Sequence, residues 1–230
     1  MLPRLLIPLA TGLGSALLFQ IQPLAARWFL PWFGGGASVW TACMLFFQVA
    51  LVGGYLYAHG LTSRVERRGQ AAIHLGLLLL AVAGLAAAAL AWPSPLTPGP
   101  SWRPGPESAP LLRLLGLLAL STGLPYLTLA TTGPLLQAWF VRLAPTRSPY
   151  PLYAVSNAGS LLGLLSYPLF VEPLLDVPAQ AWLWAGGFAV YALLVAAAAV
   201  AQAGSGAPAP EAARMEPDEA PRPSGSAGSG

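Results

Sequence analysis

The stretch that decides the fold is Tyr150–Pro173, YPLYAVSNAGSLLGLLSYPLFVEP. Its mostly apolar run is longer than the ~20 residues that a helix needs to cross the hydrocarbon core of a bilayer. It also contains Asn157, Ser160 and Glu172, which are costly in contact with lipid. A membrane-spanning helix with these side chains has to place them against other helices, in a polar cavity or at a membrane surface.

The composition of the whole chain indicates the same class of protein. Of the 230 residues 56% are hydrophobic and only 8% are charged, and the mean hydropathy is +0.63. An average soluble domain carries charge on about a quarter of its residues. Apolar runs of spanning length recur, and we expect spans over residues 4–24, 37–60, 71–92, 112–137, 152–174 and 179–202. The sequence therefore predicts an all-α, multi-pass integral membrane protein, with a six-helix transmembrane domain over residues 1–203 that has the lipid bilayer as its first partner.

The two ends of the chain need separate interpretation. The first apolar run follows Arg4, as in a secretory signal peptide, but it continues too far and lacks a clean A-x-A cleavage site. We therefore expect a first span there. Residues 204–230 are rich in Pro, Ala, Gly, Ser and acidic residues, which cannot bury enough apolar surface to fold. We expect a disordered tail, or a linker to a further domain.

Arginine indicates the orientation in the membrane, since the chain contains no lysine. On the side of the termini the predicted spans are flanked by Arg4, Arg64, Arg67, Arg68, Arg142 and Arg147, and on the other side by Arg27, Arg103 and Arg113. Cytoplasmic loops carry an excess of basic residues. We therefore expect both termini in the cytoplasm and the chain in a plasma membrane, the inner membrane of a bacterium. The few loop arginines form no basic face, so no nucleic-acid partner is expected.

A short pattern occurs twice in the chain. PLAARWF at Pro23–Phe29 and PLLQAWF at Pro134–Phe140 share P-L-x-x-x-W-F. Each copy follows the first span of a set of three, and the arginine count puts the two copies on opposite sides of the membrane. Two inverted three-helix repeats have this pattern, as in each half of major facilitator transporters. Chance repetition in a chain rich in Leu, Trp and Phe is the alternative.

Three blocks of sequence resemble a known family. They are ALLFQIQPLAARWFLPWFGGGASVWTACMLFFQVALVGGYLYAH (16–59), GPLLQAWFVR (133–142) and YPLYAVSNAGSLLGLLSYPLFVEPLL (150–175). The chain resembles the membrane part of the spermidine-synthase-like family in which major-facilitator-like spans are fused to a spermidine synthase domain. This resemblance implies a fold that is half of a major-facilitator-like bundle.

The same resemblance bears on catalysis. Fused members carry a downstream aminopropyltransferase-like domain with a glycine-rich loop after a strand, and GGGASVW (34–40) instead leads directly into a predicted span. We therefore expect a non-catalytic membrane domain that anchors or assembles with a spermidine-synthase-like partner. The alternative is half of a small-molecule carrier that acts as a homo-oligomer, and an enzyme ranks last.

Small residues predict close helix packing in the opening stretch. Gly159 and Gly163 form a G-x-x-x-G pair, which lets two helix backbones approach closely in lipid. Asn157 lies beside this pair, and its amide needs hydrogen-bond partners. It either bonds across a helix interface or lines a substrate cavity.

Further polar side chains mark a candidate cavity or helix interface. The full set is Gln20, Gln22, Gln48, Thr131, Thr132, Gln137, Asn157 and Ser160. Threonines in membrane helices commonly bond back to their own backbone. However, Pro125 and Pro134 must bend or break the long fourth run, and a broken helix can line the cavity in which a transporter binds its substrate.

The ionisable residues predict one ion pair, and they argue against polyamine transport, proton coupling and a metal or cofactor site. No acidic or basic residue lies deep in a predicted span, which disfavours polyamine transport and proton coupling. Arg27 and Glu172 close the first and fifth spans on the same side, and we expect an ion pair, with Asp176 as the competing acid and solvation of both charges as the alternative. A metal or haem site at His59 and His74 lacks a third ligand, and Cys43 is the single cysteine, so no metal or cofactor is expected.

Overall fold

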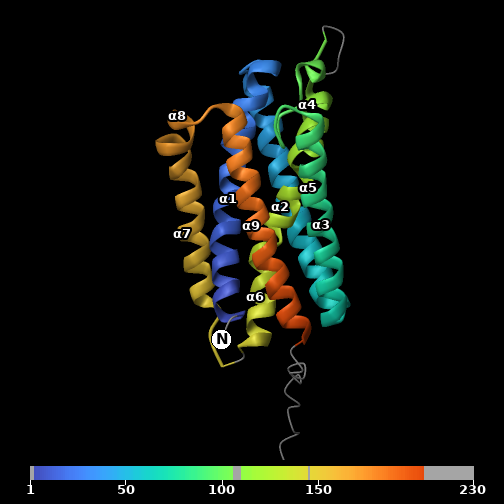
Figure 1. The fold of residues 1–230 in the computed structure, drawn as a ribbon, viewed down its shortest axis with the longest axis vertical. Coiled ribbons are helices and arrows are strands. Elements are labelled where there is room, and N and C mark those ends of the chain that lie inside the picture. Colours follow the sequence, from blue (N-terminus) through green and yellow to red (C-terminus); the bar gives the residue numbers. More distant parts are fainter. Residues whose placement is uncertain (1–2, 106–109, 145, 205–230) are drawn as a thin grey trace, which may run out of the picture.

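The structure is a computed structural model that describes residues 3–105, 110–144 and 146–204. Of these residues 88% are helical and none is in a strand. Six helices are long and apolar enough to cross a membrane, which confirms the predicted multi-pass, all-α class. Figure 1 shows them side by side in one bundle, with the start of α1 and the end of α9 at the same end. The predicted tail lies outside the described residues, except for Gly204, which ends the last helix.

The first three spans are the continuous helices α1 (Pro3–Phe33), α2 (Ala37–Arg64) and α3 (Arg67–Ala91). The predicted first span was too short, because α1 continues through Pro23 and ends only before Gly34, which has a φ of +80°. Proline is tolerated inside membrane helices, where neighbouring helices and local adjustment satisfy the freed carbonyl. Glycine adopts the left-handed backbone at a helix end without strain.

The fourth span is interrupted, as Pro125 and Pro134 predict. After the short 3-10 helix η1 (Pro100–Trp102), the span consists of α4 (Pro110–Leu118), the π-helical turn η2 (Ala119–Gly123), α5 (Leu124–Ala130) and α6 (Thr132–Leu143). The wide turn η2 comes just before Pro125, and the break at Thr131 comes just before Pro134. Both prolines lack the amide that a regular helix would bond at that point.

The last two spans are joined by a short connection. The fifth consists of α7 (Tyr150–Ser166), the π-helical turn η3 (Tyr167–Val171) and α8 (Glu172–Leu174), and the sixth is α9 (Val177–Gly204). A proline at the second position of η3 accounts for its wide turn, as in the fourth span.

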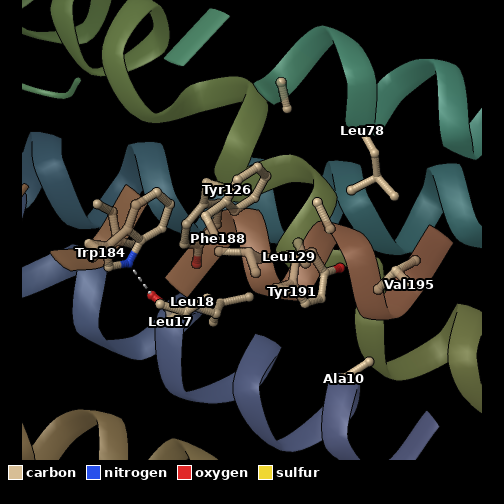
Figure 2. Packing of buried hydrophobic residues seen from close by; sticks show 14 of the residues in the cluster. Ala10, Leu17, Leu18, Leu78, Tyr126, Leu129, Trp184, Phe188, Tyr191 and Val195 are labelled. Atoms are coloured by element: carbon tan, nitrogen blue, oxygen red, sulfur yellow. Dashed lines mark hydrogen bonds between the residues drawn. The ribbon is translucent and has the colours of Figure 1, made fainter. Parts of the chain in front are cut away.

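The core lies around α1, which packs most closely on α7 and α9 and also contacts α2 and the fourth span. In addition, α3 packs on α9 and α2 packs on α5. Figure 2 shows Trp184 of α9 donating its indole N–H to the Leu17 carbonyl of α1, at 3.0 Å. Phe188 stacks on Trp184 with ring centroids 5.6 Å apart. The Tyr191 hydroxyl donates to the Thr128 carbonyl at 3.0 Å, so buried polar groups in this core join α9 to its neighbours.

Candidate functional site

A polar cavity of about 220 Å³ lies near the middle of the bundle, between α1, α2, α5, α6 and α7. Its polar lining consists of Ser15, Gln22, Gln48, Tyr55, Tyr126, Thr132, Ser156 and Ser160. Apolar side chains such as Phe19 and Leu129 complete the wall, and no charged residue belongs to it. The cavity therefore offers hydroxyl and amide groups to a bound molecule, with no counter-charge for an ion.

Hydrogen bonds between helices fix the wall of this cavity. The hydroxyl oxygens of Ser15 on α1 and Ser156 on α7 lie 2.8 Å apart. Gln22 donates its amide to the Tyr126 hydroxyl at 3.5 Å. The Thr132 hydroxyl lies 2.8 Å from that of Tyr191, behind the wall. Each contact joins two spans, so the polar groups are held in place before any ligand binds.

The break in the fourth span forms one side of the cavity. Ala130, Thr132 and Gly133 line it on either side of Thr131, whose backbone stays in the right-handed region with φ −74° and ψ −16°. Pro134 has no amide to bond the carbonyl four residues earlier, that of Ala130. A carbonyl without its helical partner at membrane depth is tolerated where protein covers it or where it lines a cavity, and Ala130 lines this one.

Close packing of α7 on α1 sets the position of the α7 wall. A Cβ atom on Gly159 would lie 2.2 Å from the Gly12 carbonyl oxygen, and one on Gly163 would lie 2.2 Å from that of Ala16. Only glycine permits these contacts, so Gly159 and Gly163 pack directly on the α1 backbone. This contact turns Ser156 towards Ser15 and the cavity.

Four of the predicted polar residues line the cavity: Gln22, Gln48, Thr132 and Ser160. Gln20 instead donates to the Ser166 hydroxyl at 3.3 Å, and Thr131 bonds back to the Thr128 carbonyl at 2.6 Å. Gln137 is half-buried on α6, away from the lining.

Asn157 lies beside the cavity wall in the sequence of α7. It is exposed on α7 and does not line the cavity, and no hydrogen bond joins its side chain to another described residue. Its neighbour Ser156 faces inward instead, because successive residues of a helix point about 100° apart. Within one chain, Asn157 therefore bonds across no interface that the structure describes.

Four polar lining residues were missing from the predicted cavity set: Ser15, Tyr55, Tyr126 and Ser156. A spacing of seven residues separates Ser15 from Gln22 and Gln48 from Tyr55. Residues seven apart lie on nearly the same face of a helix. This spacing was the signal that would have found Ser15 and Tyr55, and only the fold brings Tyr126 next to Gln22.

Arg27 and Glu172 form an ion pair at the end of the bundle away from the termini. The Arg27 guanidinium donates to a carboxylate oxygen of Glu172, and the two side chains are 36% and 45% exposed. The competing acid, Asp176, instead accepts the Ala179 amide at 2.8 Å and caps the start of α9. The pair therefore joins the end of α1 to α8.

The two histidines do not approach each other as ligands. His74 is buried on α3, with Nδ1 3.4 Å from the Tyr57 hydroxyl and its ring packed edge-on against Trp139. His59 is exposed on α2. Among the described residues no three His, Cys, Asp or Glu side chains form a group that could hold a metal ion.

Comparison of the chain with protein-family models, curated proteins and solved structures finds no match.

Proposed function

We propose that the chain is a non-catalytic membrane domain that binds a small, uncharged, polar molecule in the mid-bundle cavity, as half of a carrier. The observation that carries this proposal is the cavity itself, whose wall combines polar side chains of four spans with the break in the fourth. Transporters commonly bind their substrates near the bilayer midplane, between discontinuous helices.

The lining restricts the chemistry of the ligand. A cation such as a polyamine would be buried there without an acidic partner, which costs several kcal/mol per charge. Hydroxyl and amide side chains donate as well as accept, so they suit a polyol or an amide. The cavity of about 220 Å³ has the volume of roughly seven water molecules in the liquid, which suits a solute the size of glycerol or urea.

Corresponding residues in the first and fourth spans support two inverted three-helix repeats. Thr11-Gly12-Leu13 and Thr122-Gly123-Leu124 precede the two P-L-x-x-x-W-F copies at the same distance along the chain. Both threonines donate their hydroxyl to the carbonyl four residues earlier, at 2.8 Å in each case. α1 and the fourth span run in opposite directions (Figure 1).

The third and sixth spans correspond in the same way. Gln70 and Gln180 are both buried, and each donates its amide to the carbonyl five residues earlier, at 2.7 and 2.9 Å. The six buried positions of α3 recur at the same spacing on α9, where Ala192 is buried as well: Gln70, Ala71, His74, Leu78, Ala81 and Leu85 on α3, and Gln180, Ala181, Trp184, Phe188, Tyr191 and Val195 on α9. These matches favour a major-facilitator-like half, whose repeats create a site between them.

Arginine placement supports a plasma-membrane location with cytoplasmic termini. Arg64, Arg67, Arg68, Arg142 and Arg147 lie at the end of the bundle where α1 begins, and Arg27, Arg103 and Arg113 lie at the other end. The excess of basic residues marks the cytoplasmic side. In a bacterium the plasma membrane is the inner membrane.

Solute flux into proteoliposomes tests the carrier function. The purified chain is reconstituted, and entry of glycerol, erythritol or urea is followed by light scattering after osmotic shock. We expect faster entry of at least one of these solutes than into protein-free liposomes, and no entry of spermidine. Gln22→Leu removes a lining amide and should lower the rate about tenfold, as the loss of a buried hydrogen bond worth ~1.4 kcal/mol would.

The matched control is Gln20→Leu. Gln20 is also a half-buried amide of α1 with one bond to another span, but it does not line the cavity. Its substitution should leave the rate unchanged. Equal loss in both variants, or no solute entering faster than into protein-free liposomes, would contradict the proposal.

The family-like sequence blocks favour a second candidate, the anchoring of a spermidine-synthase-like partner. In that case a tagged chain purified from its host membrane should retain an aminopropyltransferase. An enzyme that stays in the soluble fraction, whether or not the tagged chain is present, would contradict anchoring without affecting the solute-flux result.

A further inference from the structure

A polar stripe runs along the exposed side of α2. Thr41, Gln48, Tyr55 and Thr62 follow one another at intervals of seven residues. The first three are exposed, and Gln48 and Tyr55 also line the mid-bundle cavity. A seven-residue spacing stays on one side of a helix when that helix winds around a partner. The described helices leave this side of α2 uncovered.

A second set of exposed polar residues lies on α7, at the other side of the cavity. It includes Tyr153, which is 52% exposed, and Asn157. Tyr153 is three residues before the cavity-lining Ser156 and seven before Ser160, so it lies on the same side of α7. Asn157 follows Ser156 directly. The cavity thus lies between the polar edge of α2 and the polar edge of α7.

Lipid is a poor neighbour for this polar face. No side-chain hydrogen bond joins Gln48, Tyr55 or Asn157 to another residue that the structure describes. An amide without a partner in hydrocarbon costs several kcal/mol. By contrast, α3 and α9 expose apolar side chains that suit lipid, such as Leu79, Leu80, Val190 and Leu193. A protein neighbour would give the polar side chains of this face hydrogen-bond partners, which lipid cannot.

We propose that a second copy of this chain packs against the face between α2 and α7 and closes the cavity. The inference deepens the proposed function, because it names the partner that completes the carrier. Homo-oligomers generally have closed symmetry, and the two-fold dimer is the commonest form among soluble ones. A two-fold axis along the membrane normal, through the cavity mouth, turns α2 of each copy onto α7 of the other.

The two edges match each other in chemistry and depth. Tyr55 and Ser156 line the same cavity, so Tyr55 and the adjacent Asn157 lie at the same level in the membrane. The phenol of Tyr55 can donate to the amide of Asn157 of the partner subunit, and the symmetry repeats this contact on the other side. The two cavities then face each other and form one enclosed chamber.

Disulfide cross-linking tests this geometry. In a Cys43→Ala background, a differently tagged Tyr55→Cys chain and Asn157→Cys chain are expressed together, and membranes are treated with copper phenanthroline. We expect a covalent dimer that carries both tags. The yield of this dimer should be about ten times that of a control pair, described below, whose second cysteine lies away from the interface. The reason is that an interface holds the two thiols at a high effective concentration. Each variant expressed alone should give little dimer, because the axis keeps identical positions apart.

The control pairs Tyr55→Cys with Leu193→Cys, which is exposed on α9 and away from this face. Three results would overturn the proposal. They are an equal yield from both pairs, a dimer from the single variants only, and cross-linking only to a different protein. Solute flux through the untreated wild-type protein is measured separately. A failed cross-link with intact flux refutes the interface alone, and a correct cross-link without flux refutes the carrier function alone.

Discussion

Arg27 and Glu172 are 145 residues apart in the chain, and they meet because α1 and the fifth span end at the same level. Both side chains are partly exposed, so we expect the pair to contribute ~0.5–1 kcal/mol to the free energy of unfolding. Arg27→Glu and Glu172→Arg should each lower thermal stability in detergent, and the double exchange should restore it. High salt should weaken the effect. A double variant no more stable than the single ones would show that the two charges are uncoupled.

Gly163 tests the contact between α7 and α1. Even a methyl group there would overlap the Ala16 backbone, which cannot move aside as a side chain can. Gly163→Ala should therefore destabilise the protein by about 1–3 kcal/mol, measured by thermal unfolding. Gly186→Ala on α9 is the control, because no atom lies near its added Cβ and alanine favours helix by up to ~1 kcal/mol. A tolerated Gly163→Ala would mean that the two backbones are farther apart.

The sequence predicted contacts of single residues best where few residues of the required chemistry were available. The fifth span has only two acids near its outer end, which left Arg27 few partners there, and the G-x-x-x-G pair indicates close packing by its spacing. For Asn157 the sequence left a helix interface and a cavity open, because spacing alone does not say how a helix is rotated. The contact of Gly159 and Gly163 with α1 fixes that rotation, and it turns Ser156 rather than Asn157 inward.

At the scale of elements, Pro134 keeps the fourth span broken beside the cavity. Pro134→Ala supplies the missing amide, so α5 and α6 should join into one regular helix across Thr131. Proline inside a helix costs ~3 kcal/mol, and removing it should raise or maintain thermal stability. Solute flux should fall, because the new amide at position 134 would bond the Ala130 carbonyl and withdraw it from the cavity wall. Pro8→Ala in α1, away from the cavity, is the control and should leave flux unchanged.

The existence of these elements was more predictable than their ends. Lipid requires every backbone amide to be bonded within the chain, so long apolar runs predict helices reliably. Proline ends a helix in water more strictly than in a bundle, which is why α1 passes Pro23 and continues to Phe33. The two prolines of the fourth run predicted its breaks, but the π-helical form of η2 depends on local packing that the sequence does not express.

At the scale of the whole molecule, the arginine distribution predicts one topology. Reporter fusions after Gly69 and after Pro104 should report opposite compartments, the first in the cytoplasm and the second outside. The reason is that α3 crosses the membrane between these two points. Alkaline phosphatase and green fluorescent protein fusions measure this directly. Identical compartments for both points would contradict the six-span arrangement.

The order of the helices in the bundle was beyond the sequence. Hydropathy counts spans but does not say which one the others surround. The central position of α1 depends on small residues and polar groups that find partners on late spans.

This central position has a consequence for how the chain is made. The contacts of α1 with Ser156, Ser166, Glu172 and Trp184 lie 141 to 167 residues further along the chain. During synthesis α1 enters the membrane first, and its polar groups have no such partners until the fifth and sixth spans have emerged from the ribosome. We therefore expect a nascent chain stalled after the third span to be less stable in the membrane than the complete bundle.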